Sequence, residues 1–284
     1  MRLMMFLKFL FKNKKNALKK TAKKQITTPS KTTSDDKLKK ERIAIRKGEI
    51  GEYKIDIQLS QLPKMYKYLS DLLIKNPKST TGYSQIDHVI ITPYGLFVIE
   101  TKNYQGTIYG GKDRKTWLIN GKFKMMNPLT QNYGHIQAIK HFIDVKFHNT
   151  FISMVSFTKR CTFKIELELR QINSNELVIY DIELTEYITR KIAILNLQHP
   201  TPFLMEDDIE KIYESLLNAN ISDPAIRRQH IEHIQMNKDN EEKIEVGNQC
   251  VICKKPVTEK VKSFCLSNKK FQGKIYCYDH QKTI

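Results

Sequence analysis

The sequence has no apolar run long enough to cross a membrane as a helix, which takes about 18 to 20 residues. Its N-terminal apolar stretch, LMMFLKFLF, is short and is interrupted by Lys8. A secretory signal carries its positive charges before such a run, whereas here Arg2 alone precedes it and a lysine-rich stretch follows. We therefore expect a cytoplasmic protein, in which residues 1–24 could lie against the inner membrane surface as a basic amphipathic segment.

Acidic residues are scarce relative to basic ones, with 30 Asp and Glu against 48 Lys and Arg. The resulting formal net charge of +18 favours an anionic partner, either nucleic acid or an acidic membrane surface. A hydrophobic content of 40% is typical of a folded protein rather than a disordered one. Residues 1–41 are expected to form a disordered, lysine-rich arm and linker, which could equally be a solvated tail that only aids solubility.

Cysteine is also sparse, with five in 284 residues. That number in a chain of this length argues against a disulfide framework. Four of the five lie in the last 35 residues, where the motifs CVIC and CYDH are separated by 23 residues. Two such pairs predict a tetrahedral structural Zn²⁺ site with the ligands Cys250, Cys253, Cys277 and His280. Cys265 lies within the spacer and could replace one of these four.

The tail that carries these motifs, residues 241–284, is too short for a core of its own. Metal binding would therefore supply most of its folding free energy. Its spacer contains KSFCLSNKKFQGKIY, and this mixture of basic and aromatic residues is typical of small zinc-ribbon modules that touch nucleic acid. The alternative is a zinc-stapled cap that only folds the tail or binds a protein.

Between the arm and the tail, the apolar pattern predicts an α/β protein with a mixed sheet. A helix at KGEIGEYKIDIQLSQLP, with Ile50, Tyr53, Ile57 and also Leu59 at near-helical spacing, is closed by Pro63. Three strands follow at MYKYLSDLLI, QIDHVIITP and GLFVIETKN, and the last two should pair as a hairpin through the PYG turn. A helix that starts at Pro128 and runs through DVKF, and then a strand at FISMVSF, complete the core order of helix, three strands, helix and strand.

The remaining segments predict short strands or loop at GTIYGG and KTWLING, a strand at ELVIY, and three further helices. These helices are LTEYITRKI, MEDDIEKIYESLLNAN and DPAIRRQHIEHIQMNK, and an acidic link, DNEEKIE, leads to the tail. The sequence contains no internal repeat. The domains expected after the arm are an α/β core at 42–160, an α/β and helical extension at 161–240, and the zinc-binding tail.

Two charged residues, Glu100 and Lys102, interrupt the apolar strand GLFVIETKN. Residues two apart on a strand share a face, and charges in a core are costly unless they pair or perform a task. Asp87, on the neighbouring strand, should lie near Glu100. Two carboxylates with open positions are typical of a Mg²⁺ or Mn²⁺ site, and with a lysine they could hydrolyse a phosphodiester. A structural ion pair is the alternative.

The segments KGEIGEYKI, IDHVIITPYGLFVIETKNYQGTIYG and NPLTQNYGHIQAIK occur in that order between residues 48 and 157. Together they resemble the nuclease-related domain (NERD) family, which is assigned to the PD-(D/E)xK superfamily with its restriction-endonuclease-like fold. The resemblance implies that Asp87, Glu100 and Lys102 hold the D…ExK positions. It also implies that Glu52 is the acidic residue of the first helix and that Gln131 is the polar residue of the helix after NP.

The resemblance further implies a Mg²⁺- or Mn²⁺-dependent nuclease that acts on DNA, or on RNA, without a small-molecule cofactor. A non-catalytic module that keeps the fold and holds nucleic acid or a protein is the alternative. Of the neighbouring residues, His88 should face away from Asp87 and pack or hydrogen-bond, and Trp117 should lie in the core or at its lip. His135 and His141, six residues apart, are assigned no role.

Overall fold

The structure, a computed structural model, describes residues 32–283, so residues 1–31 and the expected membrane contact of 1–24 lie outside the described residues. The chain divides into two units, with the boundary between Lys47 and Gly48. Helix α2, Thr32–Leu59, begins in the first unit and ends in the second. Residues 32–41 are therefore helix and not linker. The reason is that strong helix formers fill DDKLKKERIAIRK, with two aspartates near the helix start.

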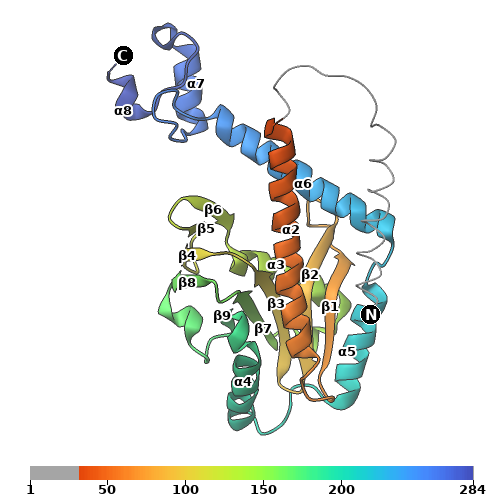
Figure 1. The fold of residues 1–284 in the computed structure, drawn as a ribbon. Coiled ribbons are helices and arrows are strands. Elements are labelled where there is room, and N and C mark those ends of the chain that lie inside the picture. The colour runs from red at the N-terminus through yellow and green to blue at the C-terminus, as the bar shows by residue number, and fades with distance from the viewer. Residues whose placement is uncertain (1–31, 284) are drawn as a thin grey trace. The chain divides into compact units, whose positions relative to one another are not determined.

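The main sheet has five strands in the order β1-β2-β3-β7-β9 (Figure 1). The first three strands are antiparallel neighbours, and β7 and β9 continue the sheet in parallel with β3. This confirms the mixed sheet and the predicted hairpin, in which Thr92 pairs with Gly95. The strands are β1 Lys67–Lys75, β2 Tyr83–Thr92, β3 Gly95–Lys102, β7 Phe151–Phe157 and β9 Glu176–Tyr180.

A second, smaller sheet has the order β6-β5-β4-β8. Trp117 of this sheet is fully buried and stacks on Phe157 of β7, with ring centroids 6.2 Å apart. The tryptophan therefore lies in the core, between the two sheets. The strands are β4 Gly106–Tyr109, β5 Thr116–Ile119, β6 Phe123–Met126 and β8 Cys161–Lys164.

The helices after α2 are α3 Pro128–Ile139, α4 Leu184–Gln198, α5 Glu206–Ala219, α6 Pro224–Gly247, α7 Glu259–Ser267 and α8 Tyr278–Gln281. Short 3-10 turns lie at η1 Lys140–Phe142, η2 Val145–Phe147, η3 Leu167–Arg170, η4 Asp181–Glu183 and η5 Lys269–Phe271. No helix in the described part of the chain is both long and apolar enough to span a bilayer.

Two of these helices differ from the sequence prediction. Helix α3 ends at Ile139 and does not run through Phe147. The side chain of Asp144 accepts a hydrogen bond from the backbone N–H of Lys146 and so starts a separate 3-10 turn. Helix α6 extends to Gly247, so the expected acidic link is helical. Its glutamates and lysines favour helix, and the glycine ends it.

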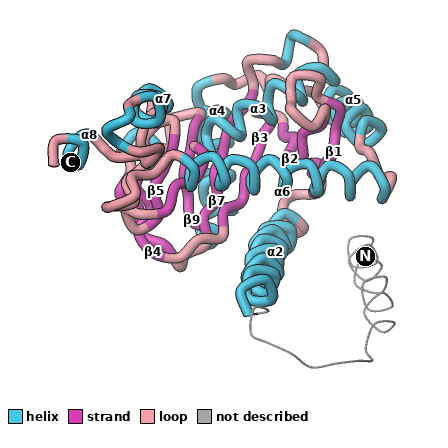
Figure 2. Tube along the Cα trace, turned by 90° about the horizontal axis from the view of Figure 1, so that it is seen from above, coloured by secondary structure: helices cyan, strands magenta, loops and turns pink. Residues whose placement is uncertain are grey.

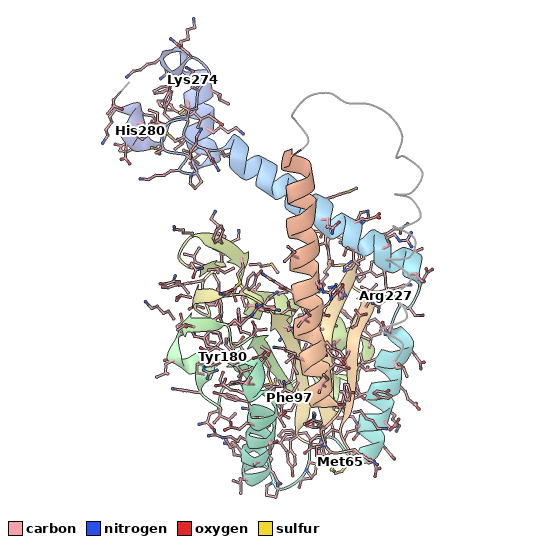
Figure 3. All side chains as sticks on the ribbon, viewed as in Figure 1. Met65, Phe97, Tyr180, Arg227, Lys274 and His280 are labelled. Carbon is pink, nitrogen blue, oxygen red and sulfur yellow. The ribbon has the colours of Figure 1, made fainter. Side chains whose placement is uncertain are left out.

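Helices cover both faces of the main sheet, and Figure 2 shows α2 and α3 on opposite sides of β2 and β3. Helices α3 and α5 pack on the face that carries Leu96 and Val98, whereas α2 and α4 pack on the face that carries Phe97 and Ile99 (Figure 3). Successive residues of β3 therefore point to different helices. This alternation decides which helix each charged residue of β2 and β3 meets.

The helix α2 turns a different side to the sheet from the one its spacing predicts. Tyr53 and Ile57 are exposed, while Ile55 and Leu59 are buried against the sheet. The backbone of α2 approaches β3 closely at Gly51, where an added Cβ would lie 3.3 Å from Cγ2 of Thr101. A glycine facing the sheet permits this approach, and it sets the buried side of the helix at residues 51, 55 and 59.

Candidate metal and carboxylate site

The candidate site lies at the end of β3, on the sheet face covered by α3. Glu100 shares the face of Val98, and Asp87 shares the face of Val89, which packs in the same core cluster. His88 pairs with Ile99 across the hairpin, so the same register places Asp87 opposite Glu100. The Oδ2 atom of Asp87 accepts a hydrogen bond of 2.6 Å from the backbone N–H of Thr101, which holds this carboxylate beside the end of β3.

Lys102, Glu100 and Gln131 form a closed hydrogen-bonded group. The Lys102 Nζ atom donates to Glu100 Oε1 at 2.6 Å and to Gln131 Oε1 at 2.9 Å. The Gln131 Nε2 atom in turn donates to Glu100 Oε1 at 2.7 Å. Glu100 is only 3% exposed. The structure thus brings Glu100, Lys102 and Gln131 into one hydrogen-bonded group, and Thr101 holds the Asp87 carboxylate beside the same end of β3.

Gln131 reaches this network because the start of α3 is fixed. Pro128 occupies the first turn, and the side chain of Asn127 accepts a hydrogen bond of 2.9 Å from the backbone N–H of Leu129. An asparagine cap followed by proline is a strong helix start. Gln131 then lies in the first turn of α3, and its side chain points to the sheet at Glu100.

Glu52, the fifth predicted residue, belongs to α2 and lies next to Gly51, where the helix meets β3. Its pKa is raised from 4.5 to about 7. Burial is the main cause, followed by the negative charges of Asp71, Glu100 and Glu49, and Lys102 opposes the shift. The Glu52 carboxylate therefore lies in the same concentrated negative field as Glu100.

The pKa of Asp87 is raised well above its usual range, first by burial and then by the charges of Glu100 and Glu52. The hydrogen bond from Thr101 and the Lys102 ammonium oppose this shift. For Lys102, burial lowers the pKa, but Glu100 and Asp87 outweigh burial and the net pKa is raised. The lysine therefore stays charged, while Asp87 and Glu52 favour taking up a proton or another cation.

A hard divalent cation fits this set of side chains. Lys102 and Gln131 both use Oε1 of Glu100, whereas Oε2 of Glu100 is buried and has no hydrogen-bond partner. Buried carboxylate oxygens are almost always bonded or bound to a metal. Carboxylate oxygens are also the donors that Mg²⁺ and Mn²⁺ prefer.

The structure adds His135, to which the sequence analysis assigned no role. Its Nδ1 atom lies 3.4 Å from Oε2 of Glu100, and the residue is 8% exposed. Burial lowers the pKa of His135, and Lys102 adds to this, whereas Glu100 opposes it. Residues four apart on a helix share a face. The four-residue spacing between Gln131 and His135 was therefore a usable signal in the sequence.

Asp71 is a second addition near the site. Its neighbours Ser70 and Leu72 pair with His88 and Ile86, which places Asp71 opposite Asp87 on the adjoining strand. Its backbone is left-handed, with a φ of 55°. The carboxylate accepts hydrogen bonds from Gln85 Nε2 at 2.9 Å and from Arg227 Nη1 of α6 at 2.8 Å (Figure 3). Asp71 was not singled out in the sequence analysis, although it is the one acidic residue in the apolar strand YLSDLLI.

His88 lies on the other face of β2, as expected. The residue is 1% exposed, and its Nδ1 atom lies 3.0 Å from Oγ of Ser70. Burial lowers the pKa of His88 to about 4, against a weaker opposing effect of Asp56. His88 is therefore a neutral, packed histidine that takes no part in the carboxylate group.

The tail brings together the four side chains of its two predicted motifs, and His280 is labelled in Figure 3. The Nδ1 atom of His280 lies 3.4 Å from Sγ of Cys250 and 3.3 Å from Sγ of Cys277. Sγ of Cys253 lies 3.7 Å from Sγ of Cys277. Ligand atoms around a tetrahedral zinc ion are roughly 3.4 to 3.8 Å apart, given bonds of about 2.0 to 2.3 Å. These distances therefore fit a Zn²⁺ ion held by three sulfurs and one nitrogen.

Cys265 lies beside this cluster and has other partners. Its Sγ atom accepts hydrogen bonds from Tyr276 N at 3.4 Å and from Gln281 Nε2 at 3.2 Å.

Burial raises the pKa of Cys250, but hydrogen bonds from backbone groups and His280 outweigh burial and lower it to about 6. The thiolate form that a metal requires is thus favoured at Cys250.

Residues 47–158 match the family model described as the nuclease-related domain. An uncharacterised protein of Bacillus anthracis is 33% identical over 192 residues, which cover 66% of this chain and 84% of that protein. The chain belongs to the nuclease-related domain family. No solved structure matches it.

The nuclease-related domain contains all five predicted site residues as well as Asp71 and His135, whereas the cysteine and histidine cluster lies outside it. The domain has the α/β, restriction-endonuclease-like fold, with a mixed sheet flanked by helices. Its core order of α2, β1, β2, β3, α3 and β7 is the one predicted from the sequence. The second sheet is inserted between β3 and α3, except for β8, which follows β7.

Proposed function

We propose that this protein is a divalent-metal-dependent nuclease that hydrolyses phosphodiester bonds in DNA, or in RNA. The observation that carries the proposal is the buried Glu100 carboxylate, which has one oxygen bonded to Lys102 and the other oxygen without a hydrogen-bond partner. Asp87 lies opposite Glu100 in the register of β2 and β3, on the same face of the sheet. A structural ion pair alone would gain nothing from a second, partly buried carboxylate, because that adds repulsion and desolvation.

In this proposal Asp87 and Glu100 hold Mg²⁺ or Mn²⁺, and Glu52 lies close enough to their charges to extend the site. When bound, the metal would polarise the phosphate and lower the pKa of a coordinated water. Lys102 orients the attacking water or offsets the negative charge that develops on the phosphate. Gln131 holds the Lys102 ammonium and the Glu100 carboxylate at a fixed separation.

The tail and the arm have supporting roles in the same proposal. Cys250, Cys253, Cys277 and His280 hold a structural Zn²⁺ ion, and the basic spacer helps to gather an anionic substrate. A cytoplasmic location suits a thiolate zinc site, because thiols stay reduced there. The family membership supports nucleic acid as the partner.

Cleavage assays on the full chain test the proposal. Purified protein with Mg²⁺ or Mn²⁺ is incubated with circular and linear DNA and with RNA. We expect cleavage to be lost in Asp87→Asn and in Lys102→Ala, with the circular dichroism spectrum and most of the DNA affinity retained. Glu186→Gln, an exposed substitution on α4, serves as the control. Equal cleavage by wild type and Asp87→Asn would contradict the assigned site.

A non-catalytic nucleic-acid- or protein-binding module is the second candidate. The closed bonding among Lys102, Oε1 of Glu100 and Gln131 favours it, because a hydrogen-bonded buried pair can be purely structural. Metal titration separates the two candidates. A nuclease should bind Mn²⁺ with an affinity that Asp87→Asn and Glu100→Gln weaken, whereas a binding module should show no such dependence.

A further inference from the structure

The segment from Lys112 to Met126 carries a concentrated positive surface that lies outside the carboxylate site. It contains five cationic residues and one acidic residue, Asp113, and the ammonium of one of the five, Lys112, pairs with Glu176 of β9. All five cationic residues are exposed, and they are Lys112, Arg114, Lys115, Lys122 and Lys124. Two apolar side chains of β6 are exposed beside them, with Phe123 66% and Met126 56% accessible.

A single buried side chain fastens this segment to helix α3. Nδ2 of Asn127 donates to the backbone carbonyl of Lys112 at 3.0 Å and to that of Arg114 at 2.8 Å. Oδ1 of Asn127 accepts the backbone N–H of Leu129 at 2.9 Å and caps α3. Gln131, which touches Glu100 and Lys102, follows four residues after Asn127. The N-terminus of α3 therefore fixes the position both of the segment from Lys112 to Met126 and of Gln131 in the candidate site.

The hairpin of β5 and β6 is rigid as well. Its two turn residues, Asn120 and Gly121, have φ values of 53° and 67°, which is the geometry of a tight type I′ turn. Oδ1 of Asn120 accepts a hydrogen bond of 2.8 Å from the backbone N–H of Thr107 on β4. The tip of the hairpin is thus tied back to its own sheet. A preformed surface loses little conformational entropy when it binds a partner.

The pairing within the hairpin orients its side chains. Trp117 pairs with Met125, and both are buried. The alternate residues Lys124 and Met126 therefore point away from the core, and Lys122 and Phe123 lie at the tip. Strand β6 is also the edge of its sheet. The result is an exposed edge on which Lys124 and the Phe123 ring lie on opposite faces of β6, because Phe123 pairs with Ile119 and shares the face of Met125.

We propose that this surface, which we call the basic hairpin (residues 112–126), binds the nucleic-acid strand on one side of the cleaved phosphate. Nucleic acid fits better than a protein or a membrane for two reasons. Lysines suit a regularly charged phosphate backbone, and the exposed Phe123 ring at the same edge suits stacking on a base. The inference rests on the proposed nuclease function for the place of the cleaved phosphate, but the binding itself does not depend on cleavage.

Equilibrium binding without divalent metal tests this. A triple variant of the full chain carries Lys115→Gln, Lys122→Gln and Lys124→Gln. Fluorescence anisotropy measures how this variant and the wild type bind a labelled 20-nucleotide DNA, both single-stranded and duplex. We expect Kd to rise at least tenfold. The slope of log Kd against log salt concentration should become less steep by about two, since each lost phosphate contact removes about 0.7 to 0.9. Phe123→Ala should weaken single-strand binding about fivefold.

A matched triple variant is the control: Lys64→Gln, Lys75→Gln and Lys211→Gln remove the same charge from exposed positions elsewhere. Both triple variants keep the arm and the tail, so those lysines contribute equally to each. We expect the control Kd to stay within twofold of wild type. An equal loss in both variants would overturn the proposal and indicate general charge attraction. No loss in the basic-hairpin variant would also overturn it.

Two further measurements distinguish this proposal from the nuclease proposal and from membrane binding. If wild type cleaves DNA, the basic-hairpin variant should show a raised KM and an unchanged kcat. If wild type does not cleave, the nuclease proposal fails and the binding result stands alone. Sedimentation with anionic phospholipid vesicles tests a membrane partner. Vesicle binding that needs the basic hairpin, with DNA affinity unchanged, would overturn the assignment to nucleic acid.

Discussion

The Nδ1 atom of His135 faces Oε2 of Glu100 at 3.4 Å, and neither atom has a hydrogen-bond partner. Both groups are buried, and unsatisfied buried polar atoms are rare in folded proteins. Two such atoms side by side, next to a carboxylate group, are expected where both act on a bound cation. The relationship also shows that helix α3 contributes two side chains to the site, at Gln131 and one turn later.

Replacing His135 should therefore weaken metal binding. We expect His135→Ala to raise the Kd for Mn²⁺ about tenfold, because residues that orient or assist metal ligands typically contribute ten- to hundredfold in affinity. Isothermal titration calorimetry on the full chain measures this directly. His141→Ala, at an exposed position just after α3, is the control and should leave the Kd unchanged. An unaltered Mn²⁺ affinity in His135→Ala would limit this histidine to packing.

Removing the ammonium group of Lys102 should destabilise the metal-free fold. The side chains of Lys102 and Glu100 are 17% and 4% exposed, so the pair is largely buried. Loss of one partner from a buried pair costs about 3 kcal/mol, because the other charge stays uncompensated. We expect Lys102→Ala to lower the free energy of unfolding by about that amount in urea. In Lys102→Ala combined with Glu100→Gln, the loss should be smaller than the sum of the two single changes.

The raised pKa of Glu52 predicts a pH-dependent stability without metal. The folded chain holds a proton at Glu52 up to about pH 7, whereas the unfolded chain loses it near 4.5. The folded state binds more protons in this window, so the free energy of unfolding should fall as pH rises from 4.5 to 7. Asp87 acts in the same direction. His88, with its pKa lowered to about 4, acts in the opposite direction between pH 4 and 6.5.

Comparison with Glu52→Gln isolates the contribution of this one carboxyl group. Thermal unfolding of both proteins in EDTA, at intervals from pH 4.5 to 8, gives the difference in stability at each pH. We expect the variant to gain stability relative to wild type as the pH rises toward 7, and Mn²⁺ to remove much of that gain by stabilising wild type. A difference that is constant across this range would show that the Glu52 pKa is not raised.

The sequence alone was sufficient to predict the relative positions of those residues that are fixed by strand periodicity and by a short turn. Glu100 and Lys102 follow from the two-residue period of a strand, and Asp87 follows from the register that the PYG turn imposes. Gln131 was placed through the family resemblance. The order of helix, three strands, helix and strand was readable because each segment has a clear apolar pattern and a clear end.

What could not be predicted depends on contacts distant in the sequence. Strand β8 pairs with β4 more than fifty residues away, so this pairing of the second sheet has no local signal. Asp71 joins the site only because β1 lies beside β2 and because its backbone adopts a left-handed conformation. The buried side of α2 depends on how closely Gly51 approaches β3. Propensity and periodicity carry no information on such pairings.

The cluster in the tail predicts one tightly bound zinc ion per chain. Three sulfurs and Nδ1 of His280 lie at separations that suit a tetrahedral ion, and the segment has a small core around Phe271 and Tyr276. Metal binding should therefore supply most of its folding free energy. We expect Cys277→Ser to lose zinc in mass-spectrometric metal analysis. Hydrogen exchange should then become fast in residues 250–283 and remain slow in the main sheet.

Cys265→Ser separates a ligand from a packed thiol. Because Sγ of Cys265 bonds to Tyr276 and Gln281, its loss should reduce the stability of the tail but leave one zinc per chain. A serine hydroxyl can replace those hydrogen bonds, whereas it cannot replace a thiolate on zinc. Equal zinc loss in Cys265→Ser and Cys277→Ser would mean that Cys265 takes part in coordination. A full zinc complement in Cys277→Ser would exclude the proposed ligand set.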